Sequence, residues 1–265
     1  MEDNKNNFTT NPVSILLSSF TLSVAILMHG GIIKVGNATR QAAATPAPQA
    51  AAPAAPAAPV VTLDKIKSLF NDKNLVYGKA DAKNLLVEVA DPSCPFCHVA
   101  AGKNPSLNTQ MNPRFTLVSE GGTYLAPIPE MKKLVDSGEA AYVYIYSPGH
   151  GSGEMGTKAL YCAKEKGKFW EVHDKLMTAE GYTLLNDQVK NDKAKSGELA
   201  NFLASAANVT DMKSCLESGK YDAKIQEDTQ IAISLGVSGT PGFFINTTNF
   251  AGAYSWTDMQ SAVQK

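Results

Sequence analysis

The chain has 265 residues, a formal net charge of −1 at pH 7 and 44% hydrophobic residues. This length and composition are typical of globular protein with one large domain or two small ones. A charge so close to zero gives no reason to expect nucleic-acid binding.

The N-terminal part divides into segments of different composition. After a short tail over residues 1–12, residues 13–35 are apolar, with His29 and Lys34 as their only ionisable residues. This length suffices to cross a bilayer, whereas a cleaved signal peptide usually has a shorter apolar region and a cleavage site close behind it. We therefore expect an uncleaved transmembrane helix over 13–35, with a cleaved signal as the alternative.

Residues 36–60 are rich in alanine and proline, which predicts a disordered, extended linker. The globular part is then expected over residues 61–265.

The positive charges that flank the apolar segment do not fix its orientation in the membrane. Among the four cysteines, a close dithiol pair with a second candidate disulfide belongs in an oxidising space outside the cytoplasm. We therefore expect a membrane-anchored protein whose globular part lies outside the cytoplasm, on the periplasmic or extracellular face.

The first half of the globular part alternates short helices and strands. Thr62 is expected to cap a helix that has Ile66, Leu69 and Phe70 on one face. The elements predicted next are strands over 75–77 and 85–90, a helix from the first cysteine to about residue 104, a hairpin over 115–125 that turns at 120–122, a helix over 130–136 and a buried parallel strand over 141–146.

A long helical segment separates these elements from the end of the chain. Residues 153–236 have a helical pattern, and strands are predicted over 242–246 and 250–253. Ser255 is expected to cap a last helix that ends at Lys265. Strands, a helical insertion, then strands and a helix indicate an α/β architecture with a helical subdomain.

Two cysteines, Cys94 and Cys97, follow the predicted strand over 85–90 and enclose Pro95 and Phe96. A helix is expected to begin here, and its free amides and partial positive charge would stabilise a thiolate at Cys94. A stabilised thiolate is a good leaving group, so a disulfide held here is easily passed to another protein. The pattern favours thiol–disulfide exchange, with the sulfur of Cys94 facing solvent.

Three separated motifs make the chain resemble the DsbA-like proteins, which are exported oxidoreductases of the thioredoxin superfamily. The motifs are Asp91-Pro-Ser-Cys94-Pro-Phe-Cys97, Gly167-Lys-Phe-Trp-Glu-Val-His-Asp174 and Val237-Ser-Gly-Thr-Pro-Gly-Phe-Phe244. Their order and spacing cover nearly all of residues 61–265. The resemblance implies a thioredoxin fold with an inserted helical subdomain over about 153–236.

The resemblance also implies roles for individual residues. Cys94 would be the exposed nucleophile, and Cys97 its buried partner that resolves mixed disulfides. Pro241 would be a cis-proline facing the disulfide, with the backbone of Thr240 exposed to a client strand. Taken alone, Thr240–Pro241 would be a plain turn, the usual structure of such a dipeptide, and only its combination with the cysteine motif favours a cis-proline.

The residues between the cysteines depart from the strongly oxidising relatives, which have histidine where this chain has Phe96. Phe96 cannot donate a hydrogen bond or carry positive charge toward Cys94. We therefore expect a less depressed pKa of Cys94 and a less oxidising disulfide than in those relatives. Phe96 offers instead an apolar face to clients. The chain between Cys97 and the strand at 141 is longer than the resemblance implies, so we expect the hairpin to be an insertion.

Two other sites carry further expectations. The resemblance implies a structural disulfide between Cys162 and Cys215, on separate helices of the insertion, and the alternative is two buried thiols that act as small apolar residues. Glu88 lies in the apolar strand before the cysteines. It is either an outward-facing strand residue or a buried carboxylate that relays protons to Cys97, as thioredoxin folds imply.

The run Cys94-Pro-Phe-Cys97-His98 also fits the attachment pattern of a c-type haem. An electron-transfer cytochrome of this kind would need a distal ligand such as methionine and a mainly helical domain. The strand before the cysteines and the Thr240–Pro241 loop argue against it. A zinc site is less favoured, because there is no second close cysteine pair and no histidine cluster. His173 and Trp170 are expected to be core or groove residues.

These patterns together predict an exported, membrane-tethered thiol–disulfide oxidoreductase that forms or rearranges disulfides in client proteins. The oxidase direction and the isomerase or reductase direction both stay open. No cofactor or metal is needed, because the electrons stay on sulfur. The expected partners are unfolded or thiol-containing exported clients and, for an oxidase, a membrane quinone-linked protein that reoxidises the pair.

Overall fold

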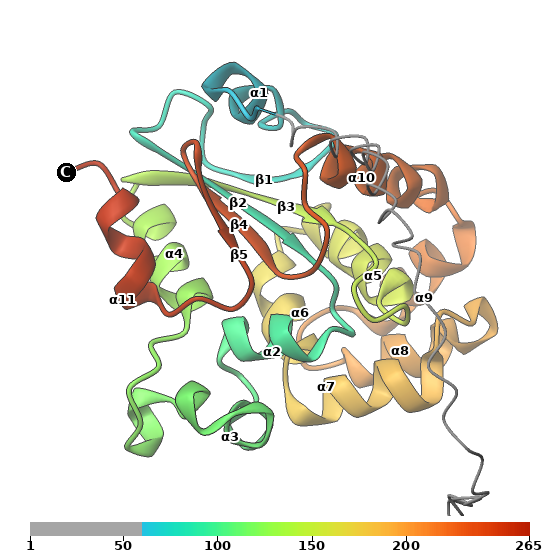
Figure 1. Cartoon of the computed structure of the whole chain (residues 1–265). Coiled ribbons are helices and arrows are strands. Elements are labelled where there is room, and N and C mark those ends of the chain that lie inside the picture. Colours follow the sequence, from blue (N-terminus) through green and yellow to red (C-terminus); the bar gives the residue numbers. More distant parts are fainter. Residues whose placement is uncertain (1–59) are drawn as a thin grey trace, which may run out of the picture. The chain divides into compact units, whose positions relative to one another are not determined.

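The residues that the structure describes, 60–265, are built around one five-stranded sheet (Figure 1). In this computed structural model the strands are β1 (Leu75–Tyr77), β2 (Asn84–Ala90), β3 (Ala140–Tyr146), β4 (Gly242–Ile245) and β5 (Thr248–Ala251). They lie in the order β1-β3-β2-β4-β5. β2 and β3 are parallel, and the other pairings are antiparallel. The predicted buried parallel strand over 141–146 is therefore confirmed.

The two central strands, β2 and β3, are buried along their whole length, because helices cover both faces of the sheet. Side chains alternate between the faces of a strand, so Val87 and Val89 point to one face and Leu86 and Glu88 to the other. This alternation decides which side chains of β2 lie on the same side as the cysteines.

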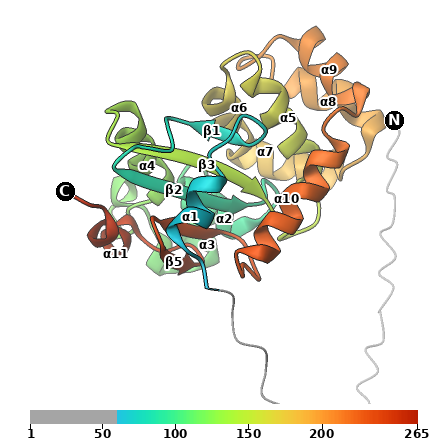
Figure 2. The same ribbon diagram turned by 90° about the horizontal axis from the view of Figure 1, so that it is seen from above.

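Helices α1 (Leu63–Ser68) and α10 (Asp222–Ser234) cover the first face (Figure 2). Ile66 of α1 and Ala232 of α10 pack into one apolar cluster with Val87. Thr62 accepts a hydrogen bond from the amide of Lys65 at 3.2 Å, so the predicted cap of the first helix is confirmed.

The second face carries α2 (Pro95–Ala101), α4 (Pro127–Asp136), α5 (Glu154–Lys164) and α6 (Phe169–Leu176). Aromatic rings join α6 to the sheet: the ring centroids of Tyr77 and Phe169 lie 4.8 Å apart, and those of Tyr142 and Trp170 lie 5.1 Å apart. Such large rings supply much of the apolar contact between the two layers.

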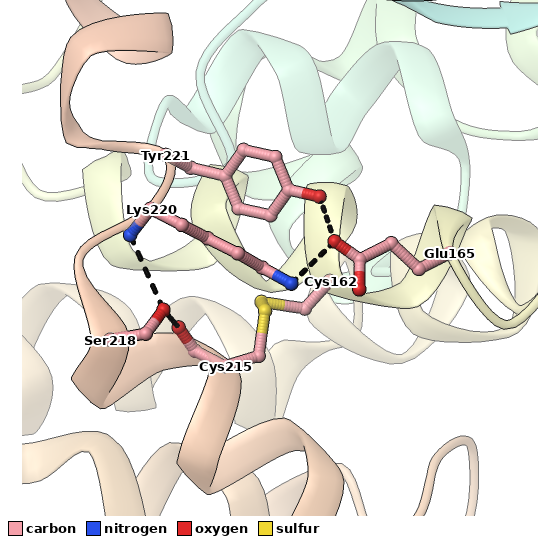
Figure 3. Close-up of a disulfide and its surroundings, with 6 residues drawn as sticks. All are labelled: Cys162, Glu165, Cys215, Ser218, Lys220 and Tyr221. Atoms are coloured by element: carbon pink, nitrogen blue, oxygen red, sulfur yellow. Dashed lines mark hydrogen bonds and ion pairs between the residues drawn. A yellow bond between two sulfur atoms is a disulfide. The ribbon is translucent and has the colours of Figure 1, made fainter.

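The chain from α5 to α10 forms a helical insertion, which also contains α7 (Ala179–Thr183), a π-helical turn (Leu184–Val189), α8 (Ser196–Phe202) and α9 (Val209–Ser218). Cys162 of α5 and Cys215 of α9 form a disulfide with their Cα atoms 6.0 Å apart (Figure 3). Beside it, Glu165 accepts hydrogen bonds from Lys220 and Tyr221. The disulfide therefore joins α5 to α9, and the ion pair and hydrogen bond of Glu165 join the end of α5 to the segment after α9.

A buried carboxylate joins this insertion to the sheet. Asp228 of α10 is fully buried and accepts hydrogen bonds from the hydroxyl of Tyr161 at 2.7 Å and from Lys224 at 2.6 Å. The amide of Tyr146 at the end of β3 lies 3.4 Å from the same carboxylate. Burial raises the pKa of Asp228, and Lys224 opposes that rise. These contacts fix α10 over α5 and the carboxyl end of β3.

The predicted hairpin over 115–125 is wrong. After α3 (Pro105–Met111) the chain forms 3-10 turns over Pro113–Phe115 and Val118–Glu120. A single bridge joins Leu117 to Tyr124, and Gly121, with a φ of 79°, turns the chain between them. Phe115 and Tyr124 then pack onto Val99 of α2 instead of extending as strands. Turn chemistry and packing on α2 outweigh the strand propensity of these residues.

The last helix is shorter than predicted. α11 covers Trp256–Met259, a 3-10 turn over Gln260–Ala262 follows it, and the helix does not reach Lys265. The side chain of Asn84 accepts a hydrogen bond from the amide of Gln264 at 2.8 Å and donates to its carbonyl at 3.1 Å. These bonds hold the end of the chain extended against β2. The hydroxyl of Ser255 makes no cap and instead bonds to the backbone of Leu125.

The predicted transmembrane helix over 13–35 and nearly all of the predicted linker over 36–60 lie outside the described residues. Within 60–265, no helix has the length and apolar character needed to cross a bilayer.

Replacing both Cys162 and Cys215 by alanine is expected to lower the free energy of unfolding. The disulfide spans a sequence separation of 53, and closing a loop of that size removes chain entropy worth about 4 kcal/mol. Chemical denaturation would measure the loss, with Cys94 and Cys97 changed to serine in both proteins to prevent exchange. A loss below about 1 kcal/mol would contradict the stabilising role.

Candidate active site

Cys94 occupies the N-cap of α2, just beyond the carboxyl end of β2. The Cys94 amide donates to the carbonyl of Asp91 at 2.9 Å, and this turn leads the chain into the helix. Pro95 takes the first helical position, where no backbone donor is needed. The amides of Phe96 and Cys97 point at the sulfur of Cys94. These free N–H groups and the helix dipole favour negative charge on that sulfur.

Cys94 is a buried residue, so the exposed position expected for it is wrong. Cys94 is 5% exposed and Cys97 is 0% exposed. The cover comes from the loop before β4, where the Thr240–Pro241 peptide bond is cis. The thiol of Cys94 donates to the carbonyl oxygen of Thr240 at 3.4 Å. The fold thus brings Cys94, Cys97, Thr240 and Pro241 together, with both cysteines as free thiols.

The two thiols have opposite pKa shifts. A hydrogen bond from Cys97 lowers the pKa of Cys94 to about 6 against the opposing effect of burial, and the amides of Cys97 and Phe96 add to this effect. Burial raises the pKa of Cys97 well above its usual range, and its interaction with Cys94 adds to the rise. Cys94 therefore ionises first. The side chain of Phe96 takes no part in these shifts, and the expected difference from relatives with histidine there stays a prediction.

The sequence patterns assigned no role to Asp91, a buried carboxylate that organises this site. Its Oδ1 accepts hydrogen bonds from the amide and the hydroxyl of Ser93, at 2.7 and 2.6 Å. Its Oδ2 accepts from the amides of Gly149 and His150, at 2.8 and 2.9 Å, in the loop between β3 and α5. An aspartate two residues before a serine at a helix start is the signal that could have identified it.

The loop that Asp91 holds also packs against the cis-proline loop. A Cβ atom at Gly149 would lie 1.7 Å from Oγ1 of Thr240, and one at Gly153 would lie 1.7 Å from Oδ1 of Asp91. Only glycine leaves room for contacts this close. Asp91 thereby connects the start of α2, through Gly149, to the position of Thr240.

Glu88 lies in the middle of β2 and is fully buried, so the alternative of an outward-facing strand residue is wrong. Tyr142 of β3 donates a hydrogen bond to its Oε2. Burial raises the pKa of Glu88, and the nearby His173 and the bond from Tyr142 oppose that rise. Glu88 in turn contributes to the raised pKa of Cys97, so the two groups are close enough to influence each other.

His98 is buried, and both of its ring nitrogens contact backbone carbonyls. Nδ1 lies 2.9 Å from the oxygen of Met177, and Nε2 lies 2.8 Å from that of Pro92. An enclosed ring with both nitrogens engaged does not fit an axial ligand of a c-type haem. Residues 60–265 contain no cluster of three or more histidine, cysteine or acidic side chains suited to a metal ion. Trp170 is half-buried and His173 is buried in α6.

A cavity of about 770 Å³ opens beside the cis-proline loop. Its lining includes Thr240 and the aromatic residues Phe96, Phe115, Tyr124 and Tyr254. Phe96 is 39% exposed, and its ring meets that of Phe115 edge-on with the centroids 6.1 Å apart. The segment after α3 therefore forms an apolar wall next to the cysteines.

Cys94 is expected to ionise near pH 6 in the reduced protein. Its thiolate forms as the pH rises through that value, while Cys97 keeps its proton through the neutral range because its pKa is raised. Ultraviolet absorbance of the thiolate measures this step, which should be missing in Cys94→Ala. A first step only above about pH 8, where ordinary thiols titrate, would contradict the arrangement described.

Gly149→Ala is expected to weaken the site, because the new methyl group must displace the side chain of Thr240. Gly197→Ala on α8 is the matched control, since a Cβ there meets its nearest neighbour at an ordinary 3.5 Å. The measurement is the rate at which the reduced protein reacts with a small disulfide. We expect a fall of about ten-fold for Gly149→Ala, the scale of a misplaced catalytic group, and none for Gly197→Ala. Equal rates for both variants would contradict the role of the contact.

The family model described as Thioredoxin matches residues 128–265, which is just over half of the chain. Two curated proteins also match: the Na(+)/H(+) antiporters NhaA 3 of Salinispora tropica and NhaA 1 of Salinispora arenicola, 26% identical over 195 residues and 24% identical over 196 residues. Each match covers 72% of this chain and 24% of the relative. The chain thus spans about a quarter of the length of the curated relatives that it matches.

Several solved structures share the fold. Oxidised BdbD from Bacillus subtilis has a TM-score of 0.52 at 18% identity, and the match covers 72% of this chain and 91% of that one. Wolbachia pipientis alpha-DsbA1 has a TM-score of 0.55 at 17% identity, with 75% and 94% covered. The catalytic domain of Proteus mirabilis ScsC has a TM-score of 0.51 at 18% identity, with 77% and 97% covered. The chain belongs to the thioredoxin family and has the fold of DsbA-type proteins, a thioredoxin-like α/β fold with a helical insertion.

Proposed function

We propose that this protein is a thiol–disulfide oxidoreductase that forms or rearranges disulfides in client proteins through Cys94 and Cys97. The opposite pKa shifts of the two thiols, beside a cis Thr240–Pro241 bond, carry the proposal. A sulfur with a lowered pKa is a good leaving group, and its disulfides exchange readily. The fold shared with DsbA-type proteins supports the same chemistry.

In the oxidase direction, the Cys94–Cys97 disulfide is the oxidant. A client thiolate attacks Sγ of Cys94, which forms a mixed disulfide and releases Cys97 as a thiolate that takes up a proton. A second client thiolate then attacks the client sulfur of the mixed disulfide, and Cys94 leaves as a thiolate. The client is oxidised by two electrons and the enzyme is reduced by the same two. The amides of α2 stabilise the departing Cys94 thiolate.

In the isomerase or reductase direction, the Cys94 thiolate attacks a client disulfide and forms a mixed disulfide. Cys97 then loses its proton and attacks Sγ of Cys94, so that the Cys94–Cys97 bond forms and the client leaves as a thiolate. Glu88 is the group proposed to exchange this proton, because it is buried and close enough to raise the pKa of Cys97. The reduction potential selects between the directions.

Clients are proposed to bind across Thr240 and the cavity beside it. The cis bond at Pro241 turns the backbone of Thr240 toward the active sulfur, where a client strand can hydrogen-bond. The aromatic wall around Phe96 and Phe115 offers apolar contact to residues that flank the client cysteine. This combination suits unfolded or partly folded chains, which expose apolar side chains.

We further propose that residues 13–35 anchor the protein in a membrane, that residues 36–60 act as a spacer and that the catalytic domain lies outside the cytoplasm. The length and apolar character of 13–35 support the anchor. The disulfide between Cys162 and Cys215 supports an oxidising compartment. A membrane quinone-linked protein would reoxidise the cysteines of an oxidase.

Equilibration of the purified protein with glutathione buffers tests the proposal, together with oxidation and isomerisation assays on a reduced and a scrambled client. The parent should exchange in at least one assay, and Cys94→Ala should lose the activity. Cys97→Ala should accumulate mixed disulfides because nothing resolves them. Full exchange by Cys94→Ala, or covalent haem in the purified protein, would overturn the assignment.

A further inference from the structure

Buried polar atoms without a protein partner gather between the sheet and α6. Among the described residues they include the hydroxyl of Tyr77 on β1, Oε1 of Glu88 on β2 and Nε2 of His173 on α6. The ring of Phe169 lies 4.8 Å from that of Tyr77 and 5.7 Å from that of His173, measured between centroids. Buried polar atoms are normally paired directly or through an ordered water. Each of these atoms thus lacks a direct protein partner in the layer between the sheet and α6.

His173 connects this layer to the surface. Its Nδ1 lies 3.2 Å from Oδ1 of Asp174, whose Oδ2 pairs with Lys103 at 2.6 Å. The side chain of His173 is 0% exposed, while that of Asp174 is 36% exposed. When Nδ1–H donates to the Asp174 carboxylate, Nε2 is left as a proton acceptor that faces the interior.

Glu88 supplies the complementary group at the inner end. Tyr142 donates to its Oε2, so Oε1 is free to carry the proton that burial favours. The ring of His173 packs against that of Trp170, and the ring of Trp170 lies 5.1 Å from that of Tyr142, which bonds to Glu88, so His173 and Glu88 belong to one packed cluster. In agreement with this packing, His173 lowers the pKa of Glu88, and Glu88 raises that of Cys97. A carboxyl group that retains its proton thus lies near an imidazole nitrogen that lacks a donor.

The geometry points to His173 and Asp174 as the route by which a proton passes between Glu88 and solvent whenever Cys97 changes between thiol and thiolate. This inference rests on the proposed thiol–disulfide exchange. When Cys97 ionises, the protonated Glu88 first passes its Oε1 proton to Nε2 of His173 through a bridging water, while Nδ1 releases one to Asp174 and solvent; the Glu88 carboxylate then takes the proton of Cys97. When Cys97 is reprotonated, each step reverses. A complete cycle has one step of each kind, so the ring returns to its first tautomer.

The other titratable groups around the pair do not compete with it near neutral pH. They are Tyr77 of β1, Tyr142 and Tyr144 of β3, and His98 of α2, with Lys103 beyond Asp174. Burial raises the pKa of each tyrosine, so the hydroxyls stay protonated. Burial lowers the pKa of His98 to about 4, so its ring stays neutral. His173 acts through Glu88 and is a positioning residue for the reaction at Cys97.

The test isolates the step in which Cys97 loses its proton. Cys94 of the reduced protein is loaded with thionitrobenzoate, and the release of this probe by attack of Cys97 is followed across the pH range. The variants are His173→Gln and Asp174→Asn. Because Asp174 is partly exposed, its variant is the one expected to fold unchanged. Asp211→Asn on α9 is the matched control, because the exposed carboxylate of Asp211 pairs with Lys166, which follows α5. Thermal unfolding checks each fold.

Near neutral pH, both variants are expected to release the probe more slowly by on the order of ten-fold, since a positioned proton relay is removed. The deficit should shrink in alkaline solution, where hydroxide takes the proton, and added imidazole should restore part of the rate. Asp211→Asn should match the parent.

Parent-like rates in both variants, or a deficit that is equal at every pH and not restored by imidazole, would overturn the relay. Release by the parent protein shows that Cys97 can attack, so either result leaves the proposed exchange standing. Absence of release from the parent would overturn the exchange itself, and the relay with it.

Discussion

The hydrogen bonds accepted by the carboxylate of Asp91 are the constraint on which the site depends. One oxygen holds Ser93 just before the first helical turn, and the other holds the amides of the loop that contains Gly149. That loop packs on Thr240, which covers the sulfur of Cys94. Asp91 therefore fixes the start of α2 and, through the loop at Gly149, the distant segment at Thr240. The hydrogen bonds of Asp91 are strong because a charged acceptor is buried and surrounded by backbone donors.

Burial gives the two cysteines their different chemistry. Both lie in the same apolar cluster, yet Cys94 has two helix amides and the thiol of Cys97 directed at its sulfur, whereas Cys97 has one amide, that of Asp91 at 3.5 Å. Cys97 faces the core and the carboxyl group of Glu88, which favour its protonated form. A dry site strengthens both effects, since charges and dipoles act through a low dielectric. The pairing of β2 with β3 places Glu88 there by bringing it next to Tyr142 on the same face of the sheet.

Much of this fold could be predicted from the sequence, because the strands and the cysteine motif are local signals. The apolar run of β2 and the alternating tyrosines of β3 specify strands, and the cysteines mark a helix start. The errors came from long-range contacts. Asn84 bonds to the backbone of Gln264, 180 residues away, where a helix was expected. Packing on α2 converts the expected hairpin into turns, and the loop at Thr240 covers a cysteine expected to be exposed. The pairing of His173 with Asp174 likewise could not be interpreted from the sequence, because the surroundings of His173 depend on how α6 packs on the sheet.

The bond between Cys162 and Cys215 bears on how the protein itself matures. If the protein is exported as proposed, the chain first carries four thiols and is then itself a substrate for the chemistry proposed for its finished form. The cysteines that belong together are neighbours in order along the polypeptide, the first with the second and the third with the fourth. If the residues after the proposed anchor emerged in chain order and were oxidised as they did so, the correct pairs would form. Maturation would then need an oxidant but no isomerase to rearrange wrongly paired disulfides.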